Sequence, residues 1–495
     1  MLRNSGLIRW RHLLMLALVV LAVLFSCAKP ALSQEGDRVP GPAGVERPAS
    51  SDKHGQPEQQ WVPSTRGISG FAAFLLGLAI IPLAAPRWWE HNRHKAIFTA
   101  VLAAPFAVYV LLNDGSALIK SLHEYFQFLT LLFSLFVIAG GIWLSGDLRS
   151  TPRNNMLFLA LGSVLASFIG TTGACMLLIR PLLSTNKERK HVKHTVIFFI
   201  FLVANIGGAL TPLGDPPLFL GYLRGVPFLW TFHLWKQWLP ACAVLLVLYY
   251  ILDNMMWKRE TEAAKSWDAT AIEPIQLRGG LNFLFLLGVM AATFFDPAIK
   301  KLLESMGLTE NVVEWVPTKE AAMLFMAYLS WKTTKMEFRK VQNFSFNPII
   351  EVAVLFLGVF ITMIPALMIL HHWGPNSPIK HPWQFFWAAG GLSSVLDNAP
   401  TYLTFFSLGL GQGNPEGMAQ ILVKSGVIKE VTLLAISSGA VFMGANTYIG
   451  NAPNFMVKAI AENSGVKMPS FFGYTGWSLA ILIPLFILLT LIFYR

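Results

Sequence analysis

Two acidic residues lie inside apolar stretches of this 495-residue chain. Asp397 has apolar chain on both sides and no basic residue nearby, and Asp215 lies in a segment with three prolines, 211–219. A carboxylate among apolar groups is costly unless it is paired, solvated or neutralised. Each of the two is therefore a candidate to bind a cation or to carry a proton.

Both carboxylates also have a structural interpretation. Asp397 precedes Asn398, Ala399 and Pro400, where a carboxylate can cap a helix by accepting backbone N–H bonds. Asp215 precedes two prolines, and Asp-Pro-Pro is a good turn and helix start. The sequence favours ion binding over capping at Asp397, where both can hold, and does not decide between the two at Asp215.

Hydroxyl and carboxamide side chains gather in the same parts of the chain. Their oxygens, with the carbonyls of interrupted helices, are suited to a small cation such as sodium. The candidate ion- or substrate-binding residues are Asp397, Asn398, Thr401, Ser394, Asp215, Thr211, Asn205, Thr171, Thr172, Asn446, Thr447 and Asn451. We predict a sodium site at Asp397 and Asn398, with backbone oxygens near Thr211 and Thr447.

The composition indicates the class of protein to which these residues belong. Hydrophobic residues make up 54% of the chain and charged residues only 13%. Apolar stretches recur along the chain, each about as long as the roughly 20 residues that cross a bilayer. We expect an integral membrane protein in contact with lipid, without a cofactor. Nucleic-acid binding is not expected, because the basic residues form short clusters between apolar stretches rather than one patch.

The chain divides into five parts. We interpret residues 1–33 as a signal peptide or N-terminal anchor and 34–66 as a disordered periplasmic arm. Two membrane units, 67–257 and 278–495, are joined by a charged cytoplasmic linker at 258–277. Basic clusters mark the cytoplasmic ends of spans. They place a multi-pass protein in the plasma (inner) membrane, with the mature N-terminus and the C-terminus outside.

Counting crossings from these clusters gives five spans in each unit. They are 68–85, 96–112, 125–144, 194–230 and 235–256, then 281–298, 317–331, 348–370, 427–461 and 472–494. The segment 156–183 begins and ends at basic clusters but is too short for two crossings, so it is predicted to be a re-entrant hairpin. A second hairpin, 383–410, is centred on Asp397. The spans 194–230 and 427–461 are broken by glycine and proline.

The two units match in sequence as well as in order. Glu124 and Glu351 lie 227 positions apart, as do Ser167 and Ser394. The string TPLGDPPLF at 211–219 matches TYIGNAPNF at 447–455 at its threonine, one glycine, one proline and the phenylalanine. Since each unit has an odd number of crossings, the copies face opposite ways. We therefore expect an all-α membrane protein of two inverted repeats, with its site where the broken helices meet.

Glu124 and Glu351 begin their predicted spans directly after loops. A solvated position at the membrane interface is the simpler interpretation of each. Their matched places in the two units also make them candidates for a proton path.

Three strings carry a resemblance to a known family: SFIGTTGA from Ser167, NIGGALTPLGDPPLF from Asn205 and DNAPT from Asp397. The chain resembles the ion transporter superfamily over about 68–494, and most resembles a citrate-transporter-like branch labelled sodium:proton antiporter. The resemblance implies a fixed scaffold, a mobile unit of hairpins and broken helices, and a homodimer. The Ser-Asn-Thr tips of the dicarboxylate symporters are absent, replaced by Gly-Thr-Thr and Asp-Asn-Ala.

We therefore expect a secondary transporter that exchanges sodium for protons at a midplane carboxylate. The alternative is a sodium-coupled symporter of citrate or another small carboxylate. A membrane-embedded enzyme is a remote third hypothesis. The string LGD ending at Asp215 is similar to the Gly-x-Gly-Asp of intramembrane aspartyl proteases, but Pro212 replaces the first glycine. Neither a Tyr-Asp partner in another span nor a His-Glu-x-x-His zinc motif is present, so we do not expect an enzyme.

Overall fold

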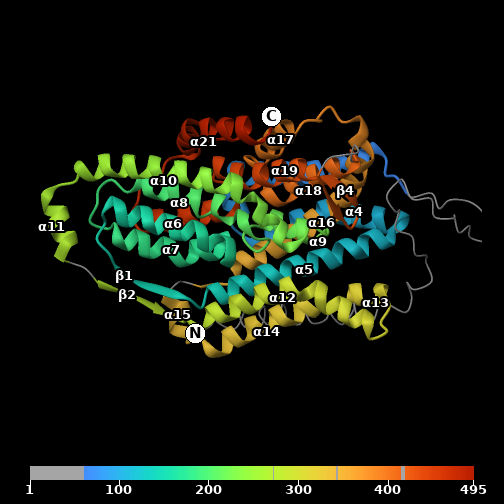
Figure 1. Ribbon diagram of the computed structural model, residues 1–495, viewed down its shortest axis with the longest axis horizontal. Helices are drawn as coiled ribbons and strands as arrows, with labels where there is room; N and C mark the ends of the chain where they lie inside the picture. The colour runs from blue at the N-terminus through green and yellow to red at the C-terminus, as the bar shows by residue number, and fades with distance from the viewer. Residues whose placement is uncertain (1–60, 271–272, 342–343, 414–418) are drawn as a thin grey trace, which may run out of the picture.

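The computed structural model describes residues 61–270, 273–341, 344–413 and 419–495. The predicted signal or anchor and residues 34–60 of the predicted arm lie outside this part of the chain. Most of the described residues are helical (Figure 1). Eight described helical segments are long and apolar enough to cross a membrane: 65–82, 92–113, 115–139, 193–210, 228–258, 281–305, 347–376 and 471–493.

The first three predicted spans correspond to α2 (Ile68–Ala84), α4 (Asn92–Asn113) and α5 (Gly115–Ala139), with η2 (Thr65–Gly67) and the short α3 (Pro86–Trp89) beside them. The predicted limits of the third span were wrong. The helix begins at Gly115, where the Asp114 carboxylate accepts the Ala117 N–H at 3.0 Å. The helix is continuous because no glycine or proline interrupts residues 116–139, and it ends at Ala139, directly before Gly140 and Gly141.

A helical hairpin and an interrupted helix follow, as predicted. The hairpin consists of α6 (Pro152–Ile169) and α7 (Thr171–Thr185), which meet at Gly170. Gly170 has φ 79°, a conformation that favours glycine. The interrupted helix consists of α8 (Lys193–Leu202), η3 (Ile206–Leu210) and α9 (Pro216–Leu223). Then come η4 (Phe228–Leu234) and α10 (Trp235–Lys258).

The second unit has the same order of elements. It begins with α12 (Leu281–Ser305), α13 (Glu310–Trp315), α14 (Thr318–Thr333), α15 (Met336–Val341), α16 (Asn347–Trp373) and η5 (Gly374–Asn376). Its hairpin is α17 (Pro382–Ser393) with α18 (Asn398–Gly411). Its interrupted helix is α19 (Glu430–Met443), η6 (Gly444–Asn446) and α20 (Ala452–Asn463), and α21 (Phe471–Phe493) is the last.

The helices are consistent with the predicted all-α membrane protein, and four short strands accompany them. β1 (Trp143–Asp147) pairs antiparallel with β2 (Glu273–Arg278), after α11 (Glu262–Thr270) in the linker. β3 (Gln420–Val423) pairs with β4 (Gly426–Lys429) between α18 and α19. Both ribbons lie at the ends of the long helices, β1 and β2 at one end and β4 at the other (Figure 1). There the chain can leave helical geometry without exposing backbone groups to lipid.

Burial separates a lipid-facing shell from a buried centre. Only 17% of the apolar segment in α4 is buried inside the protein. In the segment 193–210, which contains α8 and η3, the buried share is 94%. The interrupted helix of the first unit is thus enclosed by protein, as unpaired backbone at membrane depth requires. Around it lie α6, α10, α19 and α20. Elsewhere, α16 packs against α2, α4, α5 and α18, and α12 lies beside α14 (Figure 1).

Candidate ion-binding site at the two helix breaks

Asp215 lies where the two hairpins and the two helix breaks meet. It precedes α9 and is only 1% exposed. Its Oδ1 accepts hydrogen bonds from Thr171 Oγ1 and Asn451 Nδ2, each at 3.2 Å, and its Oδ2 accepts from Asn398 Nδ2 at 2.7 Å. Thr171 begins α7, Asn398 begins α18 and Asn451 precedes α20. Four helices therefore start around one carboxylate.

The first hairpin is fixed to the first break by hydrogen bonds. Thr171 donates its backbone N–H to Gly214 O at 2.8 Å, and Ser167 donates its hydroxyl to Gly207 O at 2.5 Å. The Thr211 hydroxyl in turn donates to Ser167 O. These bonds satisfy carbonyls that the interruption of the helix leaves unpaired.

The second hairpin makes similar contacts with the second break. Thr447 donates its hydroxyl to Ser394 O at 2.6 Å, and Asn446 Nδ2 donates to Ser394 Oγ at 2.8 Å. The Ser394 Oγ lies 2.8 Å from Gly390 O and 3.1 Å from Met443 O, and its single hydrogen can be donated to either carbonyl. Each hairpin thus presents one serine, and each break one threonine, at the point of contact.

Glycines allow the breaks to fold this tightly. A Cβ at Gly214 would lie 2.0 Å from Gly208 O, and one at Gly450 would lie 2.6 Å from Gly444 O. Real Cβ atoms essentially never come this close to a backbone oxygen. Both positions therefore require glycine.

Asp397, the carboxylate that the sequence favoured, has a different environment. It caps α18, where its Oδ1 accepts the Ala399 N–H at 3.2 Å, and its carbonyl oxygen accepts the Thr401 hydroxyl at 2.9 Å. Its side chain is half-buried. The next residue, Asn398, reaches Asp215, so Asp397 adjoins the site while Asp215 is at its centre.

The other predicted residues divide between the centre and its surroundings. Asn205 is fully buried and bonds to Asn454 and Asn451. Thr172 is half-buried. Two carboxamide oxygens, Asn398 Oδ1 and Asn446 Oδ1, are buried and have no hydrogen-bond partner within the described chain. A buried oxygen without a donor is costly, and that of Asn398 belongs to a side chain already bonded to Asp215.

Glu124 and Glu351 are both ion-paired. Arg224 Nη2 lies 2.9 Å from Glu124 Oε2, and Lys95 Nζ lies 2.7 Å from Glu351 Oε1. The prediction that Glu124 begins a span was wrong, because it lies in the interior of α5. Glu351 is in the first turns of α16, as predicted. The first pair joins α5 to the residue after α9, so it connects a long helix to the interrupted one.

The sequence interpretation missed a second buried polar cluster, at the base of the first hairpin. Asp253 on α10 is fully buried, and its carboxylate accepts from Arg189 Nη2 at 2.5 Å and lies 2.8 Å from His194 Nε2. Asn155 and Asn186, at the two ends of the hairpin, bond to each other at 2.8 and 2.9 Å. Asp253, an acidic residue inside the end of an apolar span, was the available signal.

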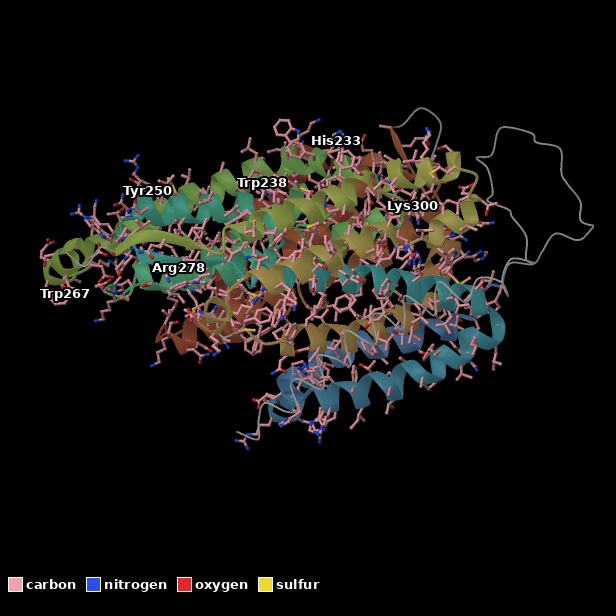
Figure 2. All side chains as sticks on the ribbon, turned by 90° about the horizontal axis from the view of Figure 1, so that it is seen from below. His233, Trp238, Tyr250, Trp267, Arg278 and Lys300 are labelled. Carbon is pink, nitrogen blue, oxygen red and sulfur yellow. The ribbon has the colours of Figure 1, made fainter. Side chains whose placement is uncertain are left out.

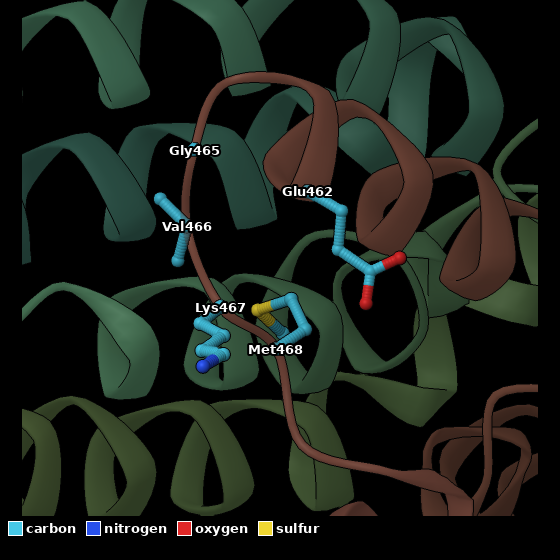
Figure 3. A pocket seen from close by; sticks show the side chains of 5 residues that line it. All are labelled: Glu462, Gly465, Val466, Lys467 and Met468. Carbon is cyan, nitrogen blue, oxygen red and sulfur yellow. The ribbon is translucent and has the colours of Figure 1, made fainter.

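An open pocket lies away from these residues. It is lined by Glu462, Gly465, Val466, Lys467 and Met468, in the turn between α20 and α21 (Figure 3). Its single acidic and single basic side chain do not resemble the amide- and hydroxyl-rich surroundings of Asp215, so it is not the candidate site.

Comparison with known proteins gives the family. Residues 62–494 match a family model described as "Putative citrate transport". The chain belongs to this family. The match includes both hairpins and both breaks. The family member is also 25% identical, over 360 residues, to an uncharacterized transporter of Mycobacterium tuberculosis and to one of Mycobacterium bovis. These alignments cover 68% of this chain and 75% of each relative.

The family and the eight apolar helical segments agree on the general class. This member of the citrate-transport family is a multi-pass membrane transporter. Within the described residues, no group of three or more His, Cys, Asp or Glu side chains is placed to hold a metal ion. The polar centre instead combines one carboxylate with hydroxyl and carboxamide groups.

Proposed function

We propose that this transporter exchanges sodium for protons by alternating access, with Asp215 as the carboxylate that the two ions share. The supporting observation is that Asp215 is buried and that, within the described residues, its carboxylate is bonded only to the neutral donors Thr171, Asn398 and Asn451. Among the described residues, no lysine, arginine or histidine forms an ion pair with it. A buried charge without a counter-charge is strongly unfavourable. A proton or a bound cation removes that penalty.

Competition for one carboxylate produces exchange. Burial favours a protonated carboxyl group, while a nearby cation favours an ionised one. Sodium binding therefore releases the proton, and a proton from the other side of the membrane displaces sodium. We assign the Asn398 Oδ1, which lacks a donor, as a further sodium ligand. Asp397 is assigned to capping α18, beside the site.

The matched contacts support the proposal of two inverted repeats. Ser167 meets Thr211 in the first unit, and Ser394 meets Thr447 in the second. Gly214 and Gly450 lie in equivalent close contacts with Gly208 and Gly444. We propose that the hairpins and broken helices form the mobile unit and that the long helices form the scaffold. We further propose a homodimer in the plasma membrane with both described ends of the chain outside.

One observation favours sodium-coupled citrate transport as a second candidate. The helices α7, α9, α18 and α20 all begin at the site. Helix N-termini present free N–H groups and a partial positive charge, which attract carboxylates. The ionised Asp215 opposes an anion at the same place unless it is protonated or holds sodium.

Purified protein in liposomes that contain a pH-sensitive dye distinguishes the two candidates. We expect release of internal protons on addition of sodium alone, and no requirement for a carboxylic acid. Chloride salts of lithium and potassium measure ion selectivity, and liposomes without protein provide the control. Uptake of labelled citrate or succinate that depends on sodium, together with no proton movement on sodium alone, would favour the symporter.

A further inference from the structure

The carboxamide of Asn451 has more acceptors than hydrogens. Its Nδ2 lies 3.1 Å from Ala204 O, 3.3 Å from Asn205 Oδ1 and 3.2 Å from Asp215 Oδ1. An asparagine NH₂ group carries two hydrogens. Two of the three acceptors can therefore receive a hydrogen bond at one time, and the third receives none. The three similar distances are compatible with exchange of the two hydrogens among the three acceptors.

The orientations of these carboxamides are fixed by backbone carbonyls. Asn454 Nδ2 donates to Gly444 O at 2.8 Å and to Thr447 O at 2.9 Å, so its Oδ1 must face Asn205. Asn205 Nδ2 donates to that oxygen at 2.7 Å and to Ile200 O at 2.8 Å. The Oδ1 of Asn205 is then left to accept from Asn451. A flip of any of these amides would place oxygen against oxygen.

This chain of amides connects the two interrupted helices. Asn205 lies between α8 and η3, whereas Asn451 and Asn454 lie at the start of α20. Asn205 and Asn454 are fully buried, and Asn451 is 3% exposed. Water therefore cannot easily replace a lost hydrogen bond. The contact between the two interrupted helices thus depends on which acceptors receive the Asn451 hydrogens.

We propose that Asn205 is a positioning residue for transport, because it competes with Asp215 for the hydrogens of Asn451. This inference rests on the proposed exchange at Asp215. When Asp215 is ionised and empty, it is the strongest acceptor and takes one hydrogen. Either Ala204 O or Asn205 Oδ1 then loses its partner, and the contact between the two breaks loosens.

Binding of a proton or a sodium ion at Asp215 changes which acceptors receive the Asn451 hydrogens. A carboxyl group that carries a proton, or a carboxylate bound to sodium, attracts the Asn451 hydrogens less. Both hydrogens then bond to Ala204 O and Asn205 Oδ1, which closes the contact between the breaks. The occupied unit moves as one body, and the empty, charged unit does not. Exchange requires this dependence, because a unit that changed sides while empty would allow one ion to move without the other.

The test is the substitution Asn205→Ala, which leaves Asp215 and Asn451 in place. In proteoliposomes we expect the maximal rate of sodium-driven proton release to fall at least about tenfold, with the half-saturating sodium concentration changed by less than about threefold. In detergent, the sodium-induced rise in Tm should persist, because the ion still binds. Ser438→Ala on α19, which removes a buried hydroxyl bonded to Leu434 O and Tyr494, is the control and should match the wild type.

A wild-type maximal rate in Asn205→Ala would overturn the inference while leaving the proposed exchange intact. A large loss of sodium affinity would also overturn it, since Asn205 would then act on binding. If the wild-type protein shows no sodium-driven proton release, the proposed function itself fails and the inference fails with it. If Asn205→Ala does not fold, Asn205→Ser is used with the same expectations, because its side chain ends one bond earlier.

Discussion

At the scale of single residues, Asp215 and Asp397 both precede helices, yet their carboxylates have different partners. Asp215 accepts from three side chains on three elements, while Asp397 accepts from the backbone of its own helix. The sequence showed that both carboxylates lie in apolar surroundings. It favoured Asp397 as the ion-binding carboxylate and did not reveal the partners of Asp215, because Asn398 and Asn451 are far from Asp215 in the chain and close to it in space.

Asn398 provides a test at this scale, since it donates to Asp215 and carries an oxygen without a partner. A hydrogen bond to a charged group contributes about 1.5–3 kcal/mol. We expect Asn398→Ala to raise the half-saturating sodium concentration by roughly ten- to hundredfold, measured by sodium-driven proton release.

The matched control for Asn398 lies on the same helix. Thr404 donates its hydroxyl to Pro400 O, at 2.8 Å, within α18. Thr404→Val should leave the sodium dependence unchanged. Equal effects of the two substitutions would mean that α18 is sensitive to any polar change, and would count against a ligand role for Asn398.

At the scale of elements, the order of long helices, helical hairpins and interrupted helices could be predicted from the sequence. Two of the ten predicted spans, 317–331 and 427–461, are not among the eight described segments that are long and apolar enough to cross a membrane. Charge clusters limited the ends of spans, and glycine and proline limited the breaks. The prediction failed at α5, where Glu124 was expected to begin a span directly after a loop. In the structure Glu124 is paired with Arg224, and a paired charge is compatible with a helix interior. The ribbon of β1 and β2 joins parts of the chain about 130 residues apart, which local patterns do not reveal.

The tightness of the first break can be tested at Gly214. A methyl group there would meet Gly208 O, so Gly214→Ala should lower stability by about 1–3 kcal/mol or more and lower the Tm in detergent. Gly391 on α17 has open space around its Cβ position, and Gly391→Ala should leave the Tm unchanged or slightly higher. Similar Tm values for both variants would show that the break is looser than described.

The linker offers a pH test outside the membrane spans. Burial alone would raise the pKa of Glu260. Hydrogen bonds from the backbone N–H groups of Lys190 and His191 and from the His191 ring outweigh it, so the pKa lies below its ordinary value of 4.5. A group with a lowered pKa stabilises the fold above its unfolded value and loses that effect as pH falls through the folded value.

We therefore expect the Tm to fall as the pH drops below about 4.5, and Glu260→Gln to reduce that fall. Glu262→Gln is the control, because the Glu262 side chain is 90% exposed and pairs with Lys265 on the same helix. If the two variants have the same Tm profile between pH 3 and 6, Glu260 does not connect the linker to the loop after α7.

At the scale of the whole molecule, we propose that the two ends of the long helices lie on opposite sides of the membrane. Trp267 on α11 lies at one end of the structure, and Lys300 lies toward the other (Figure 2). Met306, six residues after Lys300, is 71% exposed, and Trp267 is 67% exposed. Single cysteines at these two positions can therefore report the orientation.

Cys175 and Cys242 are buried. Cys27, which lies outside the described residues, is replaced by serine in the protein used for labelling. We expect Met306→Cys to react with a membrane-impermeant maleimide in intact cells, and Trp267→Cys to react only after permeabilisation. The reverse pattern would invert the orientation that the basic clusters predict. Labelling of both from outside would contradict the number of crossings between α11 and α13.

We propose that Asp215 is the carboxylate that sodium and the proton share. The most direct measurement compares sodium-driven proton release by the wild type, Asp215→Asn and Asp397→Asn in proteoliposomes. Asparagine keeps the shape of both side chains and remains a good helix cap. We expect Asp215→Asn to abolish release, because no ionisable group remains at the centre, and Asp397→Asn to retain most of it. Full activity of Asp215→Asn, or a loss confined to Asp397→Asn, would contradict the claim.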